Sequence, residues 1–170
     1  MPHFPLFVSL AEKLCVLVGG GAVAEKRAAA LLAFGAKLRV IAITPAAPIR
    51  QLAADGRIAL ATRPYGGADD LTGAFLVFAA VNDRAVSRTI AAEARTAGIL
   101  VNVADAPELC DFYFPALVRR GNLVAGISTA GDAPAFAAQI RRELDARWSA
   151  DLGEKLEAQR LARKREENLP

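Results

Sequence analysis

The chain has 170 residues, a formal net charge of +3 and an apolar fraction of 54%. Its length is that of one ordinary domain, or of one domain with a small appendage. The positive charge is small and spread along the chain, so it does not indicate a nucleic-acid-binding protein, although an anionic small substrate would suit it. No apolar run reaches the ~18 residues of a membrane span, and we expect no signal peptide because the start of the chain lacks a basic segment.

Cysteine and histidine are scarce. The sequence holds two cysteines, Cys15 and Cys110, and one histidine, His3. Because no C-x-x-C pair is present, we expect neither a zinc site nor a disulfide framework, and we predict no metal ligands. This cysteine usage favours a reducing, cytoplasmic setting. We interpret His3 as a terminal histidine rather than a metal ligand, and Cys110 as a core residue rather than a catalytic one.

The first predicted elements are a strand and a helix joined by glycines. Residues 14–18 are apolar and partly β-branched, which is typical of a buried parallel strand. Three glycines follow, and residues 23–34 then have the composition of a helix, which Gly35 ends. The order strand, glycine turn, helix is the context that a dinucleotide-binding loop requires.

Within this turn, Gly19, Gly21 and Ala24 fit the fingerprint G-x-G-x-x-G/A. The first glycine takes the tight turn, the second lets a pyrophosphate approach its backbone, and the small third residue lets the helix pack on the strand. The start of the helix offers N–H groups and a partial positive charge to the phosphates. The motif therefore predicts a dinucleotide site, with a purely structural turn as the alternative.

Further strands and helices alternate as far as residue 103. The expected strands cover residues 37–43, 58–61, 75–80 and 99–103, and the expected helices cover residues 48–54 and 85–97. This alternation predicts an α/β protein with a Rossmann-like, doubly wound parallel sheet. In such a sheet, ligands bind at the carboxyl ends of the strands.

The pattern changes after Pro107. Residues 112–119 and 123–128 predict two antiparallel strands around a turn at residues 120–122. A helix is expected over residues 134–148, with Asp132 near its cap. Residues 151–168 carry charges of both signs and leucines at helical spacing, which fits either a solvated helix or one that packs on a partner.

The end of the second strand bears on the choice of cofactor. Many dinucleotide folds place an Asp or Glu there to bind the ribose 2′-hydroxyl, or an arginine to bind a 2′-phosphate. This chain has Ile43, Thr44 and Pro45 at that position, with neither a carboxylate nor an arginine. We expect NAD rather than NADP, with the ribose held by the Thr44 hydroxyl or by backbone groups.

Three stretches carry a family resemblance. Residues 4–7 (FPLF) and 18–28 (VGGGAVAEKRA) resemble the start of precorrin-2 dehydrogenases, which also form the N-terminal part of siroheme synthases. Residues 101–116 (VNVADAPELCDFYFPA) resemble the second signature of that family, and residues 125–134 (AGISTAGDAP) are similar to the third. The resemblance runs from Phe4 to about Trp148, in order and at matching spacing.

The resemblance implies an enzyme that oxidises precorrin-2 to sirohydrochlorin with NAD, in siroheme or cobalamin synthesis. Some relatives also insert ferrous iron. It implies a nucleotide-binding domain at residues 1–111, a dimerisation region at 112–148 that supports a homodimer, and a C-terminal helical segment at 149–170. The family's catalytic aspartate maps onto Asp105. Its nucleotide contacts map onto Gly19, Gly20, Gly21, Ala22, Val23, Ile43 and Thr44, and a serine that is phosphorylated in some relatives maps onto Thr129.

The chain departs from the family pattern at a few positions. The usual Arg-Lys pair after the glycine loop is Lys26-Arg27 here. The third signature usually reads I-S-S/T-G-G-x-S-P, but Ala130 replaces its first glycine and Ala133 replaces its second serine. These changes bear on the local anion-binding geometry.

The residues themselves suggest a chemistry for Asp105. It follows a strand, so it lies at the sheet edge where a nicotinamide is expected, and a carboxylate there can take or steer a proton. Alternatively, Asp105 caps the turn at Ala106-Pro107. The carboxylates of a tetrapyrrole call for basic partners, and the candidates are Arg119, Arg120, Arg141 and Arg142; alternatively, these arginines belong to a turn and a solvated helix face. Asn102 either orients Asp105 or the substrate, or satisfies backbone groups at the strand end. Thr129 is a further candidate substrate contact.

Two other functions stay open at this point. One is a bifunctional or dedicated sirohydrochlorin ferrochelatase. The other is a non-enzymatic NAD-binding sensor on the same fold, which would not need Asp105. We expect no nucleic-acid or membrane partner for any of these functions.

Overall fold

The computed structural model describes residues 4–167. These residues form two compact units, one over Phe4–Phe112 and the other from Tyr113 onward. Each unit has its own sheet.

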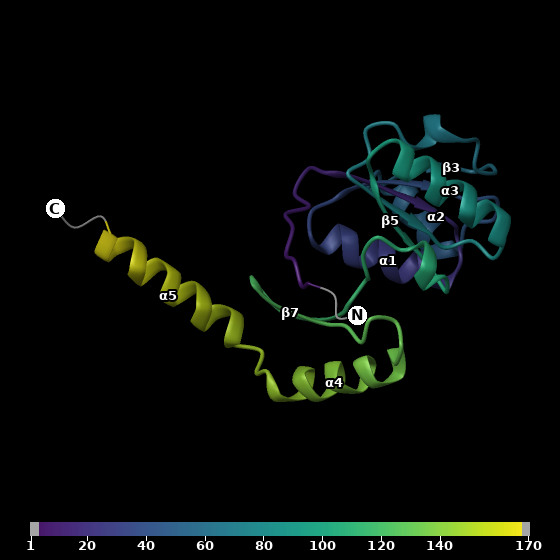
Figure 1. Ribbon diagram of the computed structural model, residues 1–170. Coiled ribbons are helices and arrows are strands. Elements are labelled where there is room, and N and C mark those ends of the chain that lie inside the picture. Colours follow the sequence, from purple (N-terminus) through teal and green to yellow (C-terminus); the bar gives the residue numbers. More distant parts are fainter. Residues whose placement is uncertain (1–3, 168–170) are drawn as a thin grey trace. The chain divides into compact units, whose positions relative to one another are not determined.

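The unit Phe4–Phe112 is built on a parallel sheet of five strands in the order β3-β2-β1-β4-β5 (Figure 1). The strands are β1 Leu14–Val18, β2 Lys37–Ile41, β3 Ala59–Ala61, β4 Leu76–Ala79 and β5 Leu100–Val103. The helices are α1 Ala22–Ala33, α2 Ala47–Ala54 and α3 Arg84–Thr96, and two 3₁₀ turns are η1 Ala68–Leu71 and η2 Pro107–Leu109. The expected Rossmann-like α/β fold is confirmed.

Helices pack on both faces of this sheet. Ile90 and Ala94 of α3 belong to the same buried cluster as Val77 of β4. Phe78 points to the opposite face, because successive strand residues alternate, and there the guanidinium of Arg27 from α1 lies 5.9 Å from the ring centre. With α1 and α3 on opposite faces and β1 paired with both β2 and β4, the strand order reverses beside β1. A ligand crevice is expected at the carboxyl ends of these strands.

The main differences from the sequence prediction lie at element ends. β2 ends at Ile41, two residues before the predicted end. The last hydrogen bond to the neighbouring β3 comes from the Ala42 N–H, which donates to the Ala61 carbonyl. Ile43 is beyond this bond and is 69% exposed. The apolar character of Ile43 therefore did not indicate pairing.

Gly35 ends α1 as predicted, with φ of 77° and an N–H that donates to the Leu32 carbonyl.

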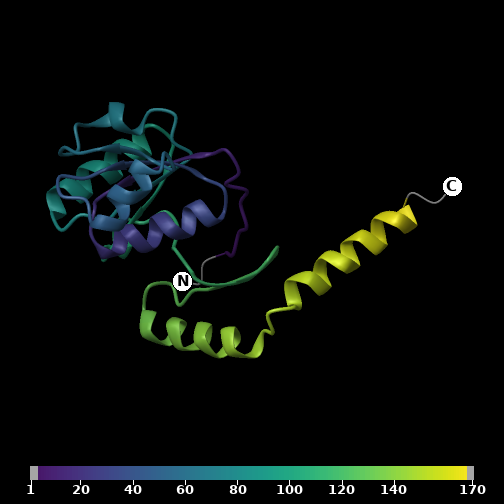
Figure 2. The same cartoon turned by 180° about the vertical axis from the view of Figure 1, so that it is seen from behind.

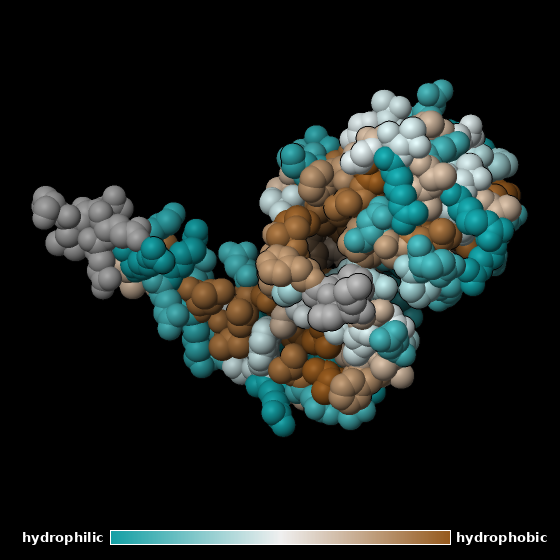
Figure 3. Space-filling view, viewed as in Figure 1, coloured by the Kyte–Doolittle hydropathy of each residue, from teal (hydrophilic) through white to brown (hydrophobic). Residues whose placement is uncertain are grey.

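Exposed apolar side chains mark the segment before β1. Phe4, Leu6 and Phe7 are 88%, 71% and 72% exposed. Hydrophobic patches, drawn brown, lie among the hydrophilic surface, drawn teal, in the space-filling view (Figure 3).

The second unit is a hairpin followed by two helices. β6 Ala116–Arg120 and β7 Leu123–Ile127 pair antiparallel, and α4 Pro134–Arg147 and α5 Leu152–Glu167 follow, separated by a short bend (Figure 2). Gly121 takes φ of 59° in the two-residue hairpin turn, where a left-handed conformation is required. A Cβ on Gly153 would lie 2.9 Å from the Arg120 carbonyl carbon, so the start of α5 approaches the backbone beside this turn closely.

One predicted start in this unit needs correction, and two residues singled out in the sequence lie outside the described part of the chain. β6 begins at Ala116 rather than at residue 112, because Pro115 has no N–H to pair. Asp132 lies next to the N-cap of α4, as predicted: the N-cap is Ala133, whose N–H donates to Thr129 Oγ1 at 3.2 Å. Asn168, the predicted end of the last helix, lies outside the described residues, as does His3.

Candidate functional site

The glycine loop begins at Gly19, directly after β1, where the neighbouring backbone leaves no room for a side chain. Its φ is 126°, and its N–H donates to the Ile41 carbonyl at 2.8 Å. A Cβ at this position would lie 2.2 Å from the Ala80 carbonyl oxygen. Only glycine fits here, because both the backbone angle and the approach to the end of β4 exclude a side chain.

Gly20 is constrained by a different neighbour. A Cβ there would lie 2.8 Å from Pro45 Cα and 2.9 Å from the Thr44 carbonyl oxygen. The Gly20 carbonyl also accepts the N–H of Ala46 at 2.8 Å. The middle glycine therefore joins the loop to the segment after β2, a role that the fingerprint does not indicate.

Gly21 differs because no protein atom lies where its side chain would be. It is the N-cap of α1, with φ of −86° and ψ of −169°, and no side chain caps the helix. A Cβ at Gly21 would meet nothing within 4 Å. The first-turn N–H groups of a helix have no intrahelical partner, and Ala22 and Val23 are exposed at this end of α1. Open space, unpaired donors and the helix dipole fit a phosphate group at this point.

The segment after β2 lies beside this loop. Ile43 and Thr44 are both exposed, as expected of residues available to a ribose. Arg50 of α2 donates from Nη1 to the Pro45 carbonyl. As predicted, residues 43–45 contain no arginine, and the first turn of α2 brings Arg50 back to the Pro45 carbonyl.

Asp105 lies just beyond β5 in a left-handed backbone conformation. Its φ is 56°, and its side chain is exposed. The preceding Ala104 N–H donates to the Ala79 carbonyl at 2.8 Å, which places Asp105 beside the end of β4. Within residues 4–167, the Asp105 carboxylate accepts no hydrogen bond, so it does not cap the turn at Ala106-Pro107.

The Cys110 thiol holds this turn. Its Sγ accepts the N–H of Val103 at 3.2 Å, and it lies 3.2 Å from the Val103 carbonyl and 3.3 Å from the Ala106 carbonyl. Burial raises the pKa of the Cys110 thiol, so it stays protonated and can donate. Cys110 therefore joins the residues before and after Asp105.

Asn102 lies beneath the same turn. It is 4% exposed, and its Nδ2 donates to the Phe112 carbonyl at 2.8 Å. Its Oδ1 is buried without a hydrogen-bond partner among the described residues. Of the roles considered for Asn102, the structure shows a bond to backbone, which holds the chain that leaves the turn.

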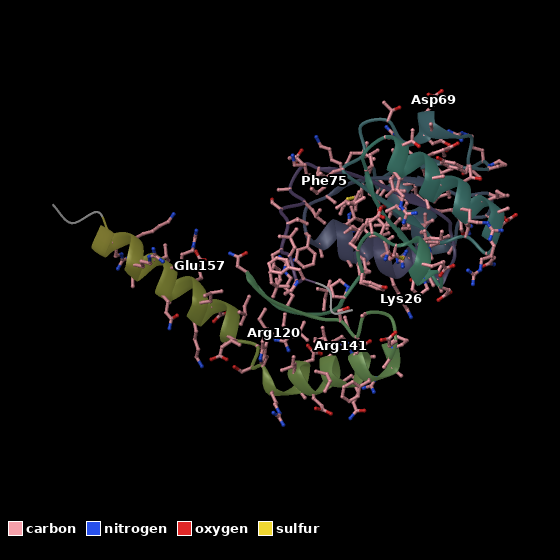
Figure 4. The ribbon with its side chains drawn as sticks, viewed as in Figure 1. Lys26, Asp69, Phe75, Arg120, Arg141 and Glu157 are labelled. Carbon is pink, nitrogen blue, oxygen red and sulfur yellow. The ribbon has the colours of Figure 1, made fainter. Side chains whose placement is uncertain are left out.

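Arg27 reaches this region from the second turn of α1. Its Nη1 lies 3.4 Å from the Ala79 carbonyl oxygen, and the side chain is half-buried over Phe78. Burial lowers the pKa of Arg27, while the nearby Cys110 and Asp105 act to raise it. In the sequence, Arg27 is noticed only as part of a reordered pair. The adjacent Lys26 is exposed on the outside of α1 (Figure 4).

The other candidate substrate contacts belong to the unit from Tyr113 onward. Arg120 joins the hairpin to the end of α4: it donates to Asp145 Oδ1 at 3.0 Å and to the Trp148 carbonyl at 3.1 Å. Nη1 of Arg141 also lies 3.7 Å from Asp145 Oδ2; Arg120 and Arg141 are labelled in Figure 4. The remaining candidates are the exposed Arg119 and Arg142 and the half-buried Thr129.

The described residues also give two negative observations. No cluster of three or more His, Cys, Asp or Glu side chains among them could hold a metal ion. In the same part of the chain, no helix has the length and apolar character needed to cross a membrane.

Comparisons with known proteins agree with this geometry. A family model described as putative NAD(P)-binding matches residues 6–116, and one described as sirohaem biosynthesis protein central matches residues 120–147. A siroheme synthase of Methylococcus capsulatus is 40% identical over 166 residues, which is 92% of this chain and 35% of that protein. A siroheme synthase of Pseudomonas aeruginosa is 41% identical over 145 residues, which is 85% of this chain and 31% of that protein. The chain thus spans about a third of the length of these relatives.

One of the similar solved structures matches this chain over most of the length of both proteins. SirC, a precorrin-2 dehydrogenase, aligns with a TM-score of 0.74 and 27% identity, covering 91% of this chain and 76% of its own. The fold and the glycine loop define a Rossmann-like dinucleotide-binding protein. More specifically, the chain belongs to the family of precorrin-2 dehydrogenases and the N-terminal parts of siroheme synthases.

Proposed function

We propose that this protein oxidises precorrin-2 to sirohydrochlorin with NAD as the hydride acceptor. The observation that carries the proposal is the position of Asp105. It is an exposed carboxylate in a left-handed turn, tied through Ala104 to the end of β4, at the same sheet edge as the glycine loop. Membership of the family and the likeness to SirC support this reaction.

The residues of this chain suit the cofactor. Gly19, Gly20 and Gly21, with the exposed first turn of α1 at Ala22 and Val23, would hold the pyrophosphate, and Ile43 and Thr44 would lie against the adenosine ribose. A bound nicotinamide supplies an acceptor for hydride. NAD is our choice because Ile43 and Thr44 offer no cation of their own to a 2′-phosphate.

The chain's own part in the chemistry is to remove a proton. Oxidising a reduced tetrapyrrole removes a hydride and a proton, so a base must act beside the hydride acceptor. Asp105 is an acceptor-only group when ionised, and its exposure leaves it accessible to a substrate. The bonds of Cys110 fix the turn on both sides of it. Asp105 therefore takes or steers the proton in our proposal.

The test is NADH formation under anaerobic conditions with enzymatically generated precorrin-2. We compare wild type, Asp105→Asn and a matched control, Asp69→Asn, which changes an exposed aspartate on η1 (Figure 4). We expect turnover in wild type and control, and a loss of roughly 10²-fold or more in Asp105→Asn with NAD binding retained. A folded wild type that binds NAD but forms no NADH contradicts the proposal.

The same samples separate the two other functions. Iron insertion into preformed sirohydrochlorin, without NADH formation from precorrin-2, would identify a dedicated ferrochelatase. A sensor would bind NAD equally well in wild type and Asp105→Asn, and neither protein would turn over either tetrapyrrole.

We also propose that the protein acts as a cytoplasmic homodimer, which assembles through the unit from Tyr113 onward. A paired hairpin and two helices with partly exposed apolar residues suit such a role. Light scattering at micromolar concentration should give twice the mass of the chain. A stable monomer contradicts the proposal.

A further inference from the structure

The side chain of Arg27 connects α1 to the edge of the sheet that carries Asp105. Arg27 begins on the second turn of α1, and its guanidinium lies 5.9 Å from the centre of the Phe78 ring. Its Nη1 lies 3.4 Å from the carbonyl oxygen of Ala79, the last residue of β4. The cation–π contact and the carbonyl together hold the positive charge at the carboxyl end of β4.

The Ala79 carbonyl also receives the chain that leads to Asp105. The N–H of Ala104 donates to this oxygen at 2.8 Å. Arg27 and the residue before Asp105 therefore converge on one acceptor. This geometry places a half-buried cation beside the backbone that leads to Asp105. Burial lowers the pKa of Arg27, and the charge of Asp105 acts in the opposite direction.

The Asp105 carboxylate itself has few constraints. Its backbone is held by the bonds of Cys110 and Ala104, but within residues 4–167 the carboxylate accepts no hydrogen bond. A base must be oriented toward the proton that it removes, and misplacement by about 1 Å can cost on the order of 10²-fold in rate. A nearby fixed cation is a means of orienting such a group without a direct bond.

We propose that Arg27 is a positioning residue whose guanidinium charge orients the Asp105 carboxylate toward the crevice. The inference rests on the proposed function, because it assigns Arg27 an effect on the same proton transfer. Arg27 does not contact the substrate in this proposal. Its effect should therefore fall on kcat and not on cofactor binding.

The experiment compares Arg27→Met, Arg27→Lys and the neighbouring Lys26→Met. Methionine and lysine both keep an unbranched stem that can pack on Phe78, but only lysine keeps the charge. Lys26 is exposed on the same helix, so Lys26→Met removes one positive charge away from Asp105. NADH formation with precorrin-2 gives kcat and KM, calorimetry gives the NAD dissociation constant, and thermal unfolding reports the fold.

We expect Arg27→Met to lower kcat by roughly tenfold or more, with KM and the NAD dissociation constant within about twofold of wild type. Arg27→Lys should recover at least about a third of the wild-type kcat, because a lysine ammonium can also lie over the Phe78 ring and restores a positive charge in this region. Lys26→Met should match wild type. If Arg27 had a purely structural role, Arg27→Met and Arg27→Lys, which have side-chain stems of equal length, would have a similar kcat.

Several outcomes would overturn the inference. One is a kcat of Arg27→Met within about twofold of wild type, and another is an equal loss in Arg27→Met and Arg27→Lys. A third is a weakening of NAD binding as large as the loss of kcat, which would make Arg27 a cofactor contact. If Arg27→Met does not fold, Arg27→Gln replaces it, and failure of both to fold also overturns the inference. The failure of the proposed function is distinct, because wild type itself would then form no NADH.

Discussion

A Gly21→Ala substitution tests whether the open space at Gly21 is needed for binding NAD rather than for folding. The position has φ of −86°, which any L-residue adopts, and a Cβ would meet no atom within 4 Å. Alanine is a poorer N-cap than glycine, but it lowers the entropy of the unfolded chain. These effects oppose each other, so we expect Gly21→Ala to change the unfolding free energy by less than about 1 kcal/mol.

The effect on NAD should be much larger. The added methyl group occupies the open space through which a phosphate would reach the backbone N–H groups of α1. Loss of one hydrogen bond to a charged group costs about 1.5–3 kcal/mol. This cost corresponds to a dissociation constant for NAD that is roughly ten- to hundredfold larger. Calorimetric titration with NAD measures this change, and denaturant unfolding measures the stability.

Gly19→Ala is the matched control with the opposite expectation. Its Cβ would lie 2.2 Å from the Ala80 carbonyl oxygen at a φ of 126°, so it should cost about 3 kcal/mol or more of a total stability of roughly 5–15 kcal/mol. If folded Gly21→Ala binds NAD within twofold of wild type, no phosphate lies at Gly21 and the reasoning is refuted. A large loss of stability in Gly21→Ala would show that protein atoms fill that space.

Three further predictions address the cofactor, an ion pair with one buried partner and a strained turn. Thr44→Asp should place a carboxylate at the expected ribose site, so the ratio of kcat/KM for NAD over NADP should rise by roughly tenfold; an unchanged ratio would mean that the ribose lies elsewhere. The Arg63 guanidinium paired with buried Asp70 holds the pKa of that carboxyl below its ordinary value, so the pair stabilises the fold above about pH 4 and this contribution is lost as the pH falls through the folded-state pKa. Asp70→Asn should therefore cost about 1–2 kcal/mol at neutral pH, because water screens the half-exposed Arg63, and urea unfolding should show the difference from wild type shrinking in acid; a difference that does not depend on pH contradicts the assignment. Ala130 has φ of 55°, so Ala130→Gly should stabilise the protein by about 0.5 kcal/mol or more, which thermal unfolding detects; a lower unfolding temperature contradicts the strain.

The sheet could be predicted from the sequence because its signals are local. Apolar runs mark the buried strands, and the glycine spacing marks the turn after β1. Where the prediction failed, the deciding contact was distant in sequence. β2 ends at Ile41 because pairing with β3 stops there, and the apolar Ile43 that follows is 69% exposed. Residue type alone does not show where pairing ends.

The supporting residues of the site were missed for the same reason. Gly20 is constrained by Pro45, and Arg27 by Ala79, each through the packing of elements that are separate in the chain. Arg50 reaches the end of the β2 segment only because α2 folds back on it. Family signatures place Asp105 and the glycines in the sequence, but such signatures do not state which neighbours hold them.

The strained backbone of Asp105 shows why those neighbours matter. A non-glycine residue at φ of 56° costs on the order of 1 kcal/mol, and such strain persists only when the surrounding structure over-determines it. Here the thiol of Cys110 bonds to Val103 and Ala106 on either side of Asp105, and Ala104 is bonded to β4. The backbone of the turn is thus fixed while the carboxylate stays exposed. Rigidity of the backbone without hydrogen bonds to the side chain is an arrangement suited to a group that must bind and release a proton.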